Sequence, residues 1–225
     1  MRAGWHGLNE TYLNPRKGND YKQCYEIDQF DDFNTLPPIL NKAISKAFPL
    51  INKKSIEILH IFELMLNTEQ HYLTNLHSDK NLHHIRTAYY PGSKKLDNQL
   101  PCGEHKDYNS ISLLFSPDEN KKLQIKTRQG EWKDIPYLDN SVVINIGNLM
   151  QVWSQDFLHS AFHRVLFNES PSFTTVYFLD LPHDLILDQI GPNKKKYDDI
   201  TVEKFRKQFQ KTKEIFRQKS SLNVK

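Results

Sequence analysis

The 225-residue chain contains only two cysteines, Cys24 and Cys102, and it has no long apolar run. Two cysteines are too few for a disulfide framework, so a reducing compartment is expected and we predict a cytoplasmic protein. A bilayer-spanning helix needs roughly 18 consecutive apolar residues, and the sequence offers no such stretch and no signal-like segment. A membrane partner is therefore not predicted.

An excess of charge of one sign is also lacking. The chain has 30 Lys and Arg against 27 Asp and Glu, which gives a net charge of +3, and the basic residues are spread rather than clustered. This distribution gives no electrostatic reason to expect a nucleic-acid partner. The length and the 38% hydrophobic content suit a single sizeable core. None of these features sets the oligomeric state.

Short runs of alternating apolar and polar residues dominate the middle of the chain. The first covers residues 84–90 and is closed by Pro91-Gly92, and later runs lie at 111–115, 123–125, 132–135, 141–148 and 173–179. Turn residues separate them at close spacing, which is typical of an all-β sandwich or barrel.

The flanks show helical periodicity instead. The sequence predicts a short helix that ends near Pro49, a second helix over 55–76, and a third over 201–217. The second helix should bury a stripe made of Ile56, Leu59, Phe62, Met65 and Leu66. These boundaries give an N-terminal linking segment with helices at 1–82, a β domain at 83–182, and a C-terminal loop with a capping helix at 183–225.

Two His-x-Asp triplets stand out, one beginning at His77 and one at His105. Residues two apart in a strand point to the same face, so His105 and Asp107 can bind one ion together. A third ligand must come from elsewhere, and His163 is the candidate. His77 follows a helical pattern and precedes a polar run, so we expect a solvated loop histidine there.

Two neutral imidazoles and one carboxylate on one side of an ion leave its other side open, which suits Fe(II) and O2 chemistry. Ligand type alone does not exclude Zn(II). His159 shares the strand parity of His163, so geometry leaves both histidines open as ligands. Cys102, three residues before His105, is expected to be a bystander.

Six motifs follow one another between residues 84 and 182. They are Tyr89-Tyr90-Pro91, His105-x-Asp107, Leu123-Gln124-Ile125, Asn145-Ile146-Gly147-Asn148, Gln151-Val152-Trp153-Ser154 and Ser160-x-x-His163-Arg164-Val165. In this order they resemble the isopenicillin N synthase-like branch of the 2-oxoglutarate- and Fe(II)-dependent dioxygenase superfamily. The resemblance implies a double-stranded β-helix (jelly-roll) core, mainly β with flanking helices. It also implies an Fe(II) site at His105, Asp107 and His163.

The resemblance fails at the cosubstrate contacts. Relatives that use 2-oxoglutarate carry an R-x-S element whose arginine pairs with the far carboxylate of the cosubstrate. The corresponding residues here are Ser172 and Thr174, so the hydroxyl is kept and the guanidinium is lost. Where relatives often have Asn-Tyr-Tyr-Pro, this chain has Ala88 in place of Asn and keeps Tyr90. The cosubstrate contacts implied by the resemblance are thus Tyr90, Thr174 and Ser172.

The loss of the arginine predicts weak 2-oxoglutarate binding, which Ser172→Arg should strengthen. Removing one partner of a buried, hydrogen-bonded charge pair costs about 2–5 kcal/mol. Tight binding would mean that another basic residue, such as Arg86 or Lys126, has taken the arginine's place.

The resemblance implies an Fe(II)-dependent oxygenase that hydroxylates or desaturates a small organic molecule with O2, with 2-oxoglutarate as its cosubstrate. The lost arginine keeps two alternatives open. One is an oxidase of the same class that needs no 2-oxoglutarate, and the other is a catalytically impaired relative that retains the fold as a binding module. Relatives also carry a further strand and helix before the segments that resemble residues 4–8 and 21–27, so the chain is expected to lack the usual N-terminal segment.

Overall fold

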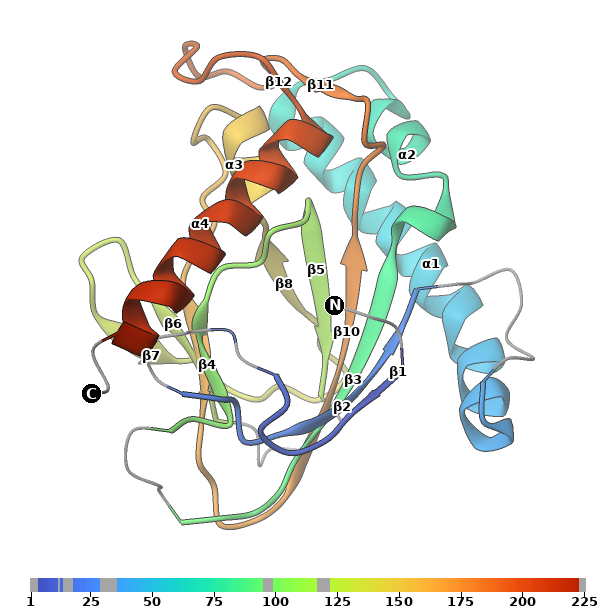
Figure 1. Ribbon diagram of the computed structural model, residues 1–225. Helices are drawn as coiled ribbons and strands as arrows, with labels where there is room; N and C mark the ends of the chain where they lie inside the picture. The colour runs from blue at the N-terminus through green and yellow to red at the C-terminus, as the bar shows by residue number, and fades with distance from the viewer. Residues whose placement is uncertain are drawn as a thin grey trace.

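The computed structural model describes residues 4–11, 13, 18–28, 36–94, 99–116 and 122–222. A large antiparallel sheet has the strand order β1 (Gly4–His6), β2 (Gln23–Ile27), β3 (His84–Tyr90), β10 (Ser172–Leu179), β5 (Ile111–Phe115) and β8 (Val143–Ile146). A smaller antiparallel sheet has the order β4 (Cys102–His105), β9 (His163–Leu166), β6 (Lys122–Lys126) and β7 (Trp132–Asp134). The two sheets face each other as the predicted jelly roll (Figure 1).

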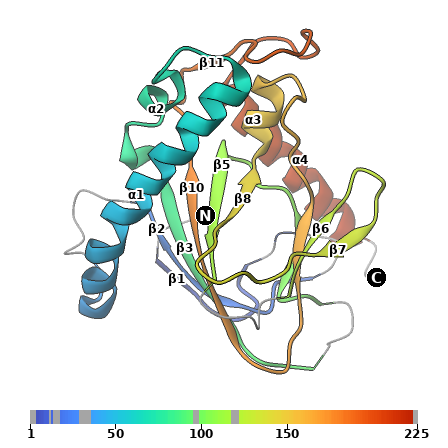
Figure 2. The ribbon, with the colours of Figure 1, turned by 180° about the vertical axis from the view of Figure 1, so that it is seen from behind.

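Helices surround the sheets. They are α1 (Pro38–Leu66), α2 (Tyr72–Leu76), the 3-10 turn η2 (Lys80–Leu82), α3 (Asn148–Trp153) and α4 (Val202–Leu222). A two-stranded ribbon, β11 (Ile186–Leu187) with β12 (Ile200–Thr201), precedes α4. The long helices α1 and α4 lie on opposite sides of the molecule, as the front and back views agree (Figures 1 and 2). Among the helices that the structure describes, none combines the length and the hydrophobicity of a bilayer-spanning segment.

The register of the large sheet sorts its side chains onto two faces. Ile27 pairs with Ile85, and Ile85 with Tyr177, so these three form one cross-strand row. All three belong to the main hydrophobic core, together with α1 residues such as Leu59 and Phe62. Because residues alternate along a strand, the neighbouring positions point the other way, into the space between the two sheets.

The first long helix corrects the sequence prediction. α1 runs through Pro49 without ending, so the predicted break there and the predicted start at residue 55 are wrong. Ile44 and Phe48, in the turns before the proline, are buried in the core. Their packing keeps the N-terminal half of the helix in line although Pro49 lacks a donor for the helical hydrogen bond.

The buried stripe of α1 also differs in part from the prediction. Leu59, Phe62 and Leu66 are buried as expected, but Ile56 and Met65 are 41% and 48% exposed. With α1 extended back to Pro38, the buried face is set by contacts along its whole length rather than by the local period of residues 55–66.

Candidate metal centre

Three side chains meet at the edge of the small sheet. His105 is the last residue of β4, His163 is the first of β9, and the two are Cα partners in this antiparallel pair. Asp107 stands in the loop after β4. The strand alternation assumed from the sequence therefore does not place this carboxylate, and the loop does.

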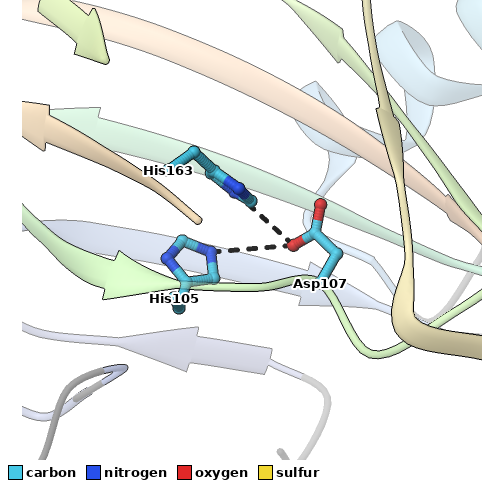
Figure 3. Close-up of side chains that lie close together, drawn as sticks. All are labelled: His105, Asp107 and His163. Carbon is cyan, nitrogen blue, oxygen red and sulfur yellow. Dashed lines mark ion pairs between the residues drawn. The ribbon is translucent and has the colours of Figure 1, made fainter. Parts of the chain in front are cut away.

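The ligand atoms of the triad converge on one point. One nitrogen from each of His105 and His163 and one oxygen of Asp107 all lie within 4.8 Å of one another (Figure 3). The Nε2 atoms of His105 and His163 are 3.6 Å and 3.7 Å from Oδ1 of Asp107. Two imidazole nitrogens and a carboxylate oxygen form a donor set for a divalent transition-metal ion.

The histidine rings are held in the form that a metal requires. Nδ1 of His105 lies 2.8 Å from the carbonyl oxygen of Gly103, and Nδ1 of His163 lies 3.3 Å from that of Ala161. An Nδ1–H that donates to a carbonyl leaves the Nε2 lone pair facing Asp107. Burial, together with the neighbouring ring of His163, lowers the pKa of His105 well below its usual value. This ring is therefore neutral at physiological pH.

The loop that carries Asp107 is anchored by the start of α3. The backbone N–H of Asn148 donates to the carbonyl oxygen of Asp107 at 2.9 Å. Just before it, Gly147 packs so closely that a Cβ atom there would lie 1.7 Å from the carbonyl oxygen of Asn109. Glycine is thus required at position 147 because the metal-site loop rests directly on it.

Asn145 on β8 is a site residue to which the sequence analysis assigned no role. Its Nδ2 lies 3.2 Å from Oδ2 of Asp107 and 3.4 Å from Nε2 of His163. The amide donates to the carboxylate oxygen that is turned away from the histidines, and so it fixes the orientation of the carboxylate. The sequence did contain Asn145 in the Asn145–Asn148 motif. Strand alternation alone, however, could not predict that its side chain lies beside Asp107 and His163.

A pocket extends from the triad into the space between the sheets. It is lined by Lys22, Arg86, Ala88, Tyr90, Cys102, His105, Asp107, Leu114, Leu123, His163, Val165, Thr174, Val176 and Phe178. Two of these residues are cations, Lys22 and Arg86. Sequence reasoning named Arg86 as a candidate and missed Lys22, which lies in a segment without clear periodicity.

The predicted cosubstrate residues divide into two groups. Tyr90 and Thr174 line the pocket, whereas Ser172 is buried but is not among the described lining residues. The Thr174 hydroxyl is buried without a hydrogen-bond partner in the described part of the chain, so it can bind a ligand. Lys126 lies elsewhere, with its Nζ 5.7 Å from the ring centroid of Trp132.

The other two candidate histidines do not join the triad. His159 is exposed and lies outside the cluster of ligand atoms, so the ambiguity between His159 and His163 is resolved in favour of His163. His77 is 5% exposed, so the expectation of a solvated loop histidine is wrong. Its ring turns inward after α2, with Nδ1 2.7 Å from the Leu73 carbonyl oxygen and Nε2 2.9 Å from the Ser110 hydroxyl.

The chain is similar in sequence to known oxygenases over part of its length. Residues 81–180 match the 2OG-Fe(II) oxygenase superfamily. The homoarginine-6-hydroxylase 2-ODD-C23 of Glycine max is 29% identical over 119 residues, which are 50% of this chain and 36% of that protein. Protein DOWNY MILDEW RESISTANCE 6 of Arabidopsis thaliana is 24% identical over 196 residues, 83% of this chain and 57% of that protein. The chain spans about a third of the length of relatives such as the hydroxylase.

Solved structures show the same fold. A full-length Neurospora crassa protein, crystallised in complex with alpha-KG, gives a TM-score of 0.78 at 24% identity, over 92% of this chain and 72% of that one. JOX2 in complex with 2OG, Fe and JA gives 0.74 at 21% identity, over 91% and 64%. The region at residues 81–180 belongs to the 2OG-Fe(II) oxygenase superfamily. The family resemblance and the jelly-roll fold predicted from the motifs are confirmed.

Proposed function

We propose that the protein is a non-haem Fe(II)-dependent oxygenase that uses O2 and 2-oxoglutarate to oxidise a small organic molecule. The observation that carries the proposal is the convergence of His105, Asp107 and His163 on the wall of a pocket, in a region that belongs to this superfamily. Three protein ligands on one side leave positions open on the pocket side of an ion. The donor atoms alone would also accept Zn(II), and the family relation favours Fe(II).

The chain's own residues have separable roles in such an enzyme. His105, Asp107 and His163 would hold the iron, and Asn145 orients the carboxylate. When bound, iron and 2-oxoglutarate would supply the activation of O2 for oxidation of the substrate, with succinate and CO2 as co-products. Tyr90 and Thr174, in the pocket wall, are the residues we assign to cosubstrate binding.

The test separates metal binding from turnover. The protein should bind one Mn(II) per chain in place of Fe(II). The Fe(II)-loaded protein under air, with ascorbate added as the reductant, should convert 2-oxoglutarate slowly to succinate even without substrate. His163→Ala should lose both properties. Stoichiometric Mn(II) binding without binding or turnover of 2-oxoglutarate would contradict the proposal. That result would favour the 2-oxoglutarate-independent oxidase or the impaired relative.

The substrate is proposed only as a small organic molecule, since the relatives act on chemically different compounds, as names such as homoarginine-6-hydroxylase and thebaine 6-O-demethylase show. Both Cys24 and Cys102 are free thiols. We propose a cytoplasmic location, where thiols stay reduced, and no nucleic-acid partner, because the net charge is only +3.

A further inference from the structure

The pocket face of the large sheet carries a lysine near the position where the family resemblance expects an arginine. Gln23 on β2 pairs with Tyr89 on β3, so Lys22, one residue earlier, lies beside Tyr90. On the other side of Tyr90, the Cα partner on β10 is Ser172. Because cross-strand neighbours share a face, Lys22, Tyr90 and Ser172 form one row.

This arrangement lets the side chain of Lys22 reach the region of the pocket that an arginine at position 172 would occupy. Neighbouring strands are roughly 4.8 Å apart, so Lys22 and Ser172 start from backbones about 10 Å apart, with Tyr90 between them. The four-carbon side chain of lysine can cover much of that gap. Lys22 does reach the pocket, because it lines the same cavity as the metal triad and Thr174.

The amine of Lys22 is buried but keeps an N–H donor with which it can bind an anion. Lys22 and its ion-pair partner Asp20 are both 2% exposed, and Nζ lies 2.8 Å from Oδ2 of Asp20 and 3.5 Å from Sγ of Cys102. An ammonium group has three N–H donors, so these two described partners leave one donor for a ligand. Burial opposes the charge, but Cys102 and Asp20 outweigh it and raise the pKa of Lys22, so the amine is cationic at neutral pH.

The other basic candidates are less suited. Arg86 also lines the pocket, but its Nε donates to Glu26 at 2.5 Å and its guanidinium lies 5.3 Å from the ring centroid of Phe178. Lys126 lies against Trp132, outside the described pocket lining. The pocket lining that includes Lys22 also includes Thr174, whose buried hydroxyl has no hydrogen-bond partner among the described residues and can take a polar ligand.

We propose that Lys22 replaces the missing arginine and binds the distal carboxylate of 2-oxoglutarate, with the Thr174 hydroxyl as a further contact. This inference rests on the proposed function, since it requires that 2-oxoglutarate enters the pocket. It also revises the expectation of weak binding, which assumed that no cation had taken the place of the guanidinium. The positive charge then comes from Lys22, just before β2, instead of from an arginine at position 172 on β10.

The experiment is a titration of the Mn(II)-loaded full chain with two ligands. One is 2-oxoglutarate, and the other is 2-oxopentanoate, which has the same chain length but lacks the distal carboxylate. Lys22→Met should raise the dissociation constant for 2-oxoglutarate at least about 30-fold and leave that for 2-oxopentanoate unchanged. Lys126→Met, the same substitution outside the pocket, should change neither.

A second variant guards against a folding defect. Lys22→Met leaves the Asp20 carboxylate buried without its partner, so Lys22→Met combined with Asp20→Asn is measured in parallel. The asparagine oxygen can still accept the Gly103 N–H, which lies 2.9 Å from Oδ1 of Asp20. Both variants should lose the preference for 2-oxoglutarate over 2-oxopentanoate.

The outcomes separate the two proposals. If the folded double variant prefers 2-oxoglutarate as strongly as the wild type does, the role of Lys22 is overturned and the proposed function stands. If the wild type binds Mn(II) but not 2-oxoglutarate, the cosubstrate itself is excluded, and the inference about Lys22 is overturned with it.

Discussion

The two faces of the large sheet differ sharply although they are built from the same strands. On the face toward α1, the row Ile27, Ile85 and Tyr177 continues to Leu113 on β5, and every member is almost completely buried. One residue further along the strands, the pocket face carries the ion pair of Glu26 and Arg86.

The difference shows how one sheet can serve stability and chemistry separately. Apolar burial on the helix face supplies favourable free energy in proportion to the area removed from water. Buried charges on the pocket face cost desolvation free energy, and they are tolerated because each described cation there has a carboxylate partner. Because side chains alternate strictly along a strand, substitutions on one face should leave the function of the other face intact.

The largest expected effect comes from the pocket side. Asp107→Ala removes one of the three proposed metal ligands and should abolish stoichiometric Mn(II) binding, measured by titration calorimetry or by the loss of the free Mn(II) signal in electron paramagnetic resonance. Asp184→Ala, an exposed aspartate outside the site, is the matched control and should bind one equivalent. Retained binding in Asp107→Ala would show that the metal lies elsewhere.

Two adjacent leucines on β5 test the comparison directly. Leu113 is fully buried in the helix-side core, whereas Leu114 lines the pocket. Leu113→Ala should lower the free energy of unfolding by about 2–5 kcal/mol, because it leaves a cavity, and the folded fraction should bind Mn(II) normally. Leu114→Ala should cost less, because it enlarges a pocket that already exists. Urea denaturation of both variants would contradict the division of roles if Leu114→Ala proved the more destabilising.

A smaller effect is expected at the contact beneath the metal loop. Gly147→Ala places a methyl group against the Asn109 carbonyl, so the loop that carries Asp107 must shift. Overpacking of this kind costs about 1–3 kcal/mol, and Mn(II) affinity should fall along with stability. Gly130→Ala is the control, since a Cβ there meets nothing within 4 Å although its φ of +88° is strained. It should lower stability slightly and leave Mn(II) affinity unchanged, which a paired titration would verify.

The sequence was sufficient for the parts of the site that lie in local motifs. His105, Asp107 and His163 occur in recognisable motifs at strand ends, and the alternating runs predicted the strands that place Tyr90 and Thr174 in the pocket wall. Each motif depends on residues close together in the chain, where periodicity is informative. The grouping of the motifs into one site came from their order and the family resemblance.

The parts that could not be predicted depend on long-range register. Lys22 lies in a segment without periodicity, and its place beside Tyr90 follows only once β2 is paired with β3. Asn145 reaches Asp107 because β8 is the edge strand of the large sheet and pairs with β5. His77 looked like a loop residue because nothing local indicates that α2 ends by turning its ring toward Ser110.

Stability should depend on pH through His77, which is buried beside Ser110. Burial lowers the pKa of His77 to about 3, from an ordinary value near 6.5. In the unfolded chain this ring takes up a proton as the pH falls below about 6.5, whereas the folded protein excludes that proton until about pH 3. The contribution of His77 to stability is therefore fully present above pH 6.5 and declines as the pH falls, by at most about 1.4 kcal/mol per pH unit.

Comparing the wild type with His77→Gln isolates the contribution of His77 to the pH dependence of stability, because the other buried histidines are present in both proteins. At pH 7 the variant should be less stable by about 1–3 kcal/mol, since Ser110 and the Leu73 carbonyl lose well-placed partners. The difference should narrow between pH 6.5 and pH 5, because only the wild type must keep a histidine unprotonated at this position. Urea denaturation at pH 7, 6 and 5 measures the gap, and a gap that stays constant would mean that the His77 ring is not held neutral by burial. Mn(II) binding at pH 7 should be the same in both proteins, since His77 hydrogen-bonds to Leu73 and Ser110 and lies outside the described metal cluster.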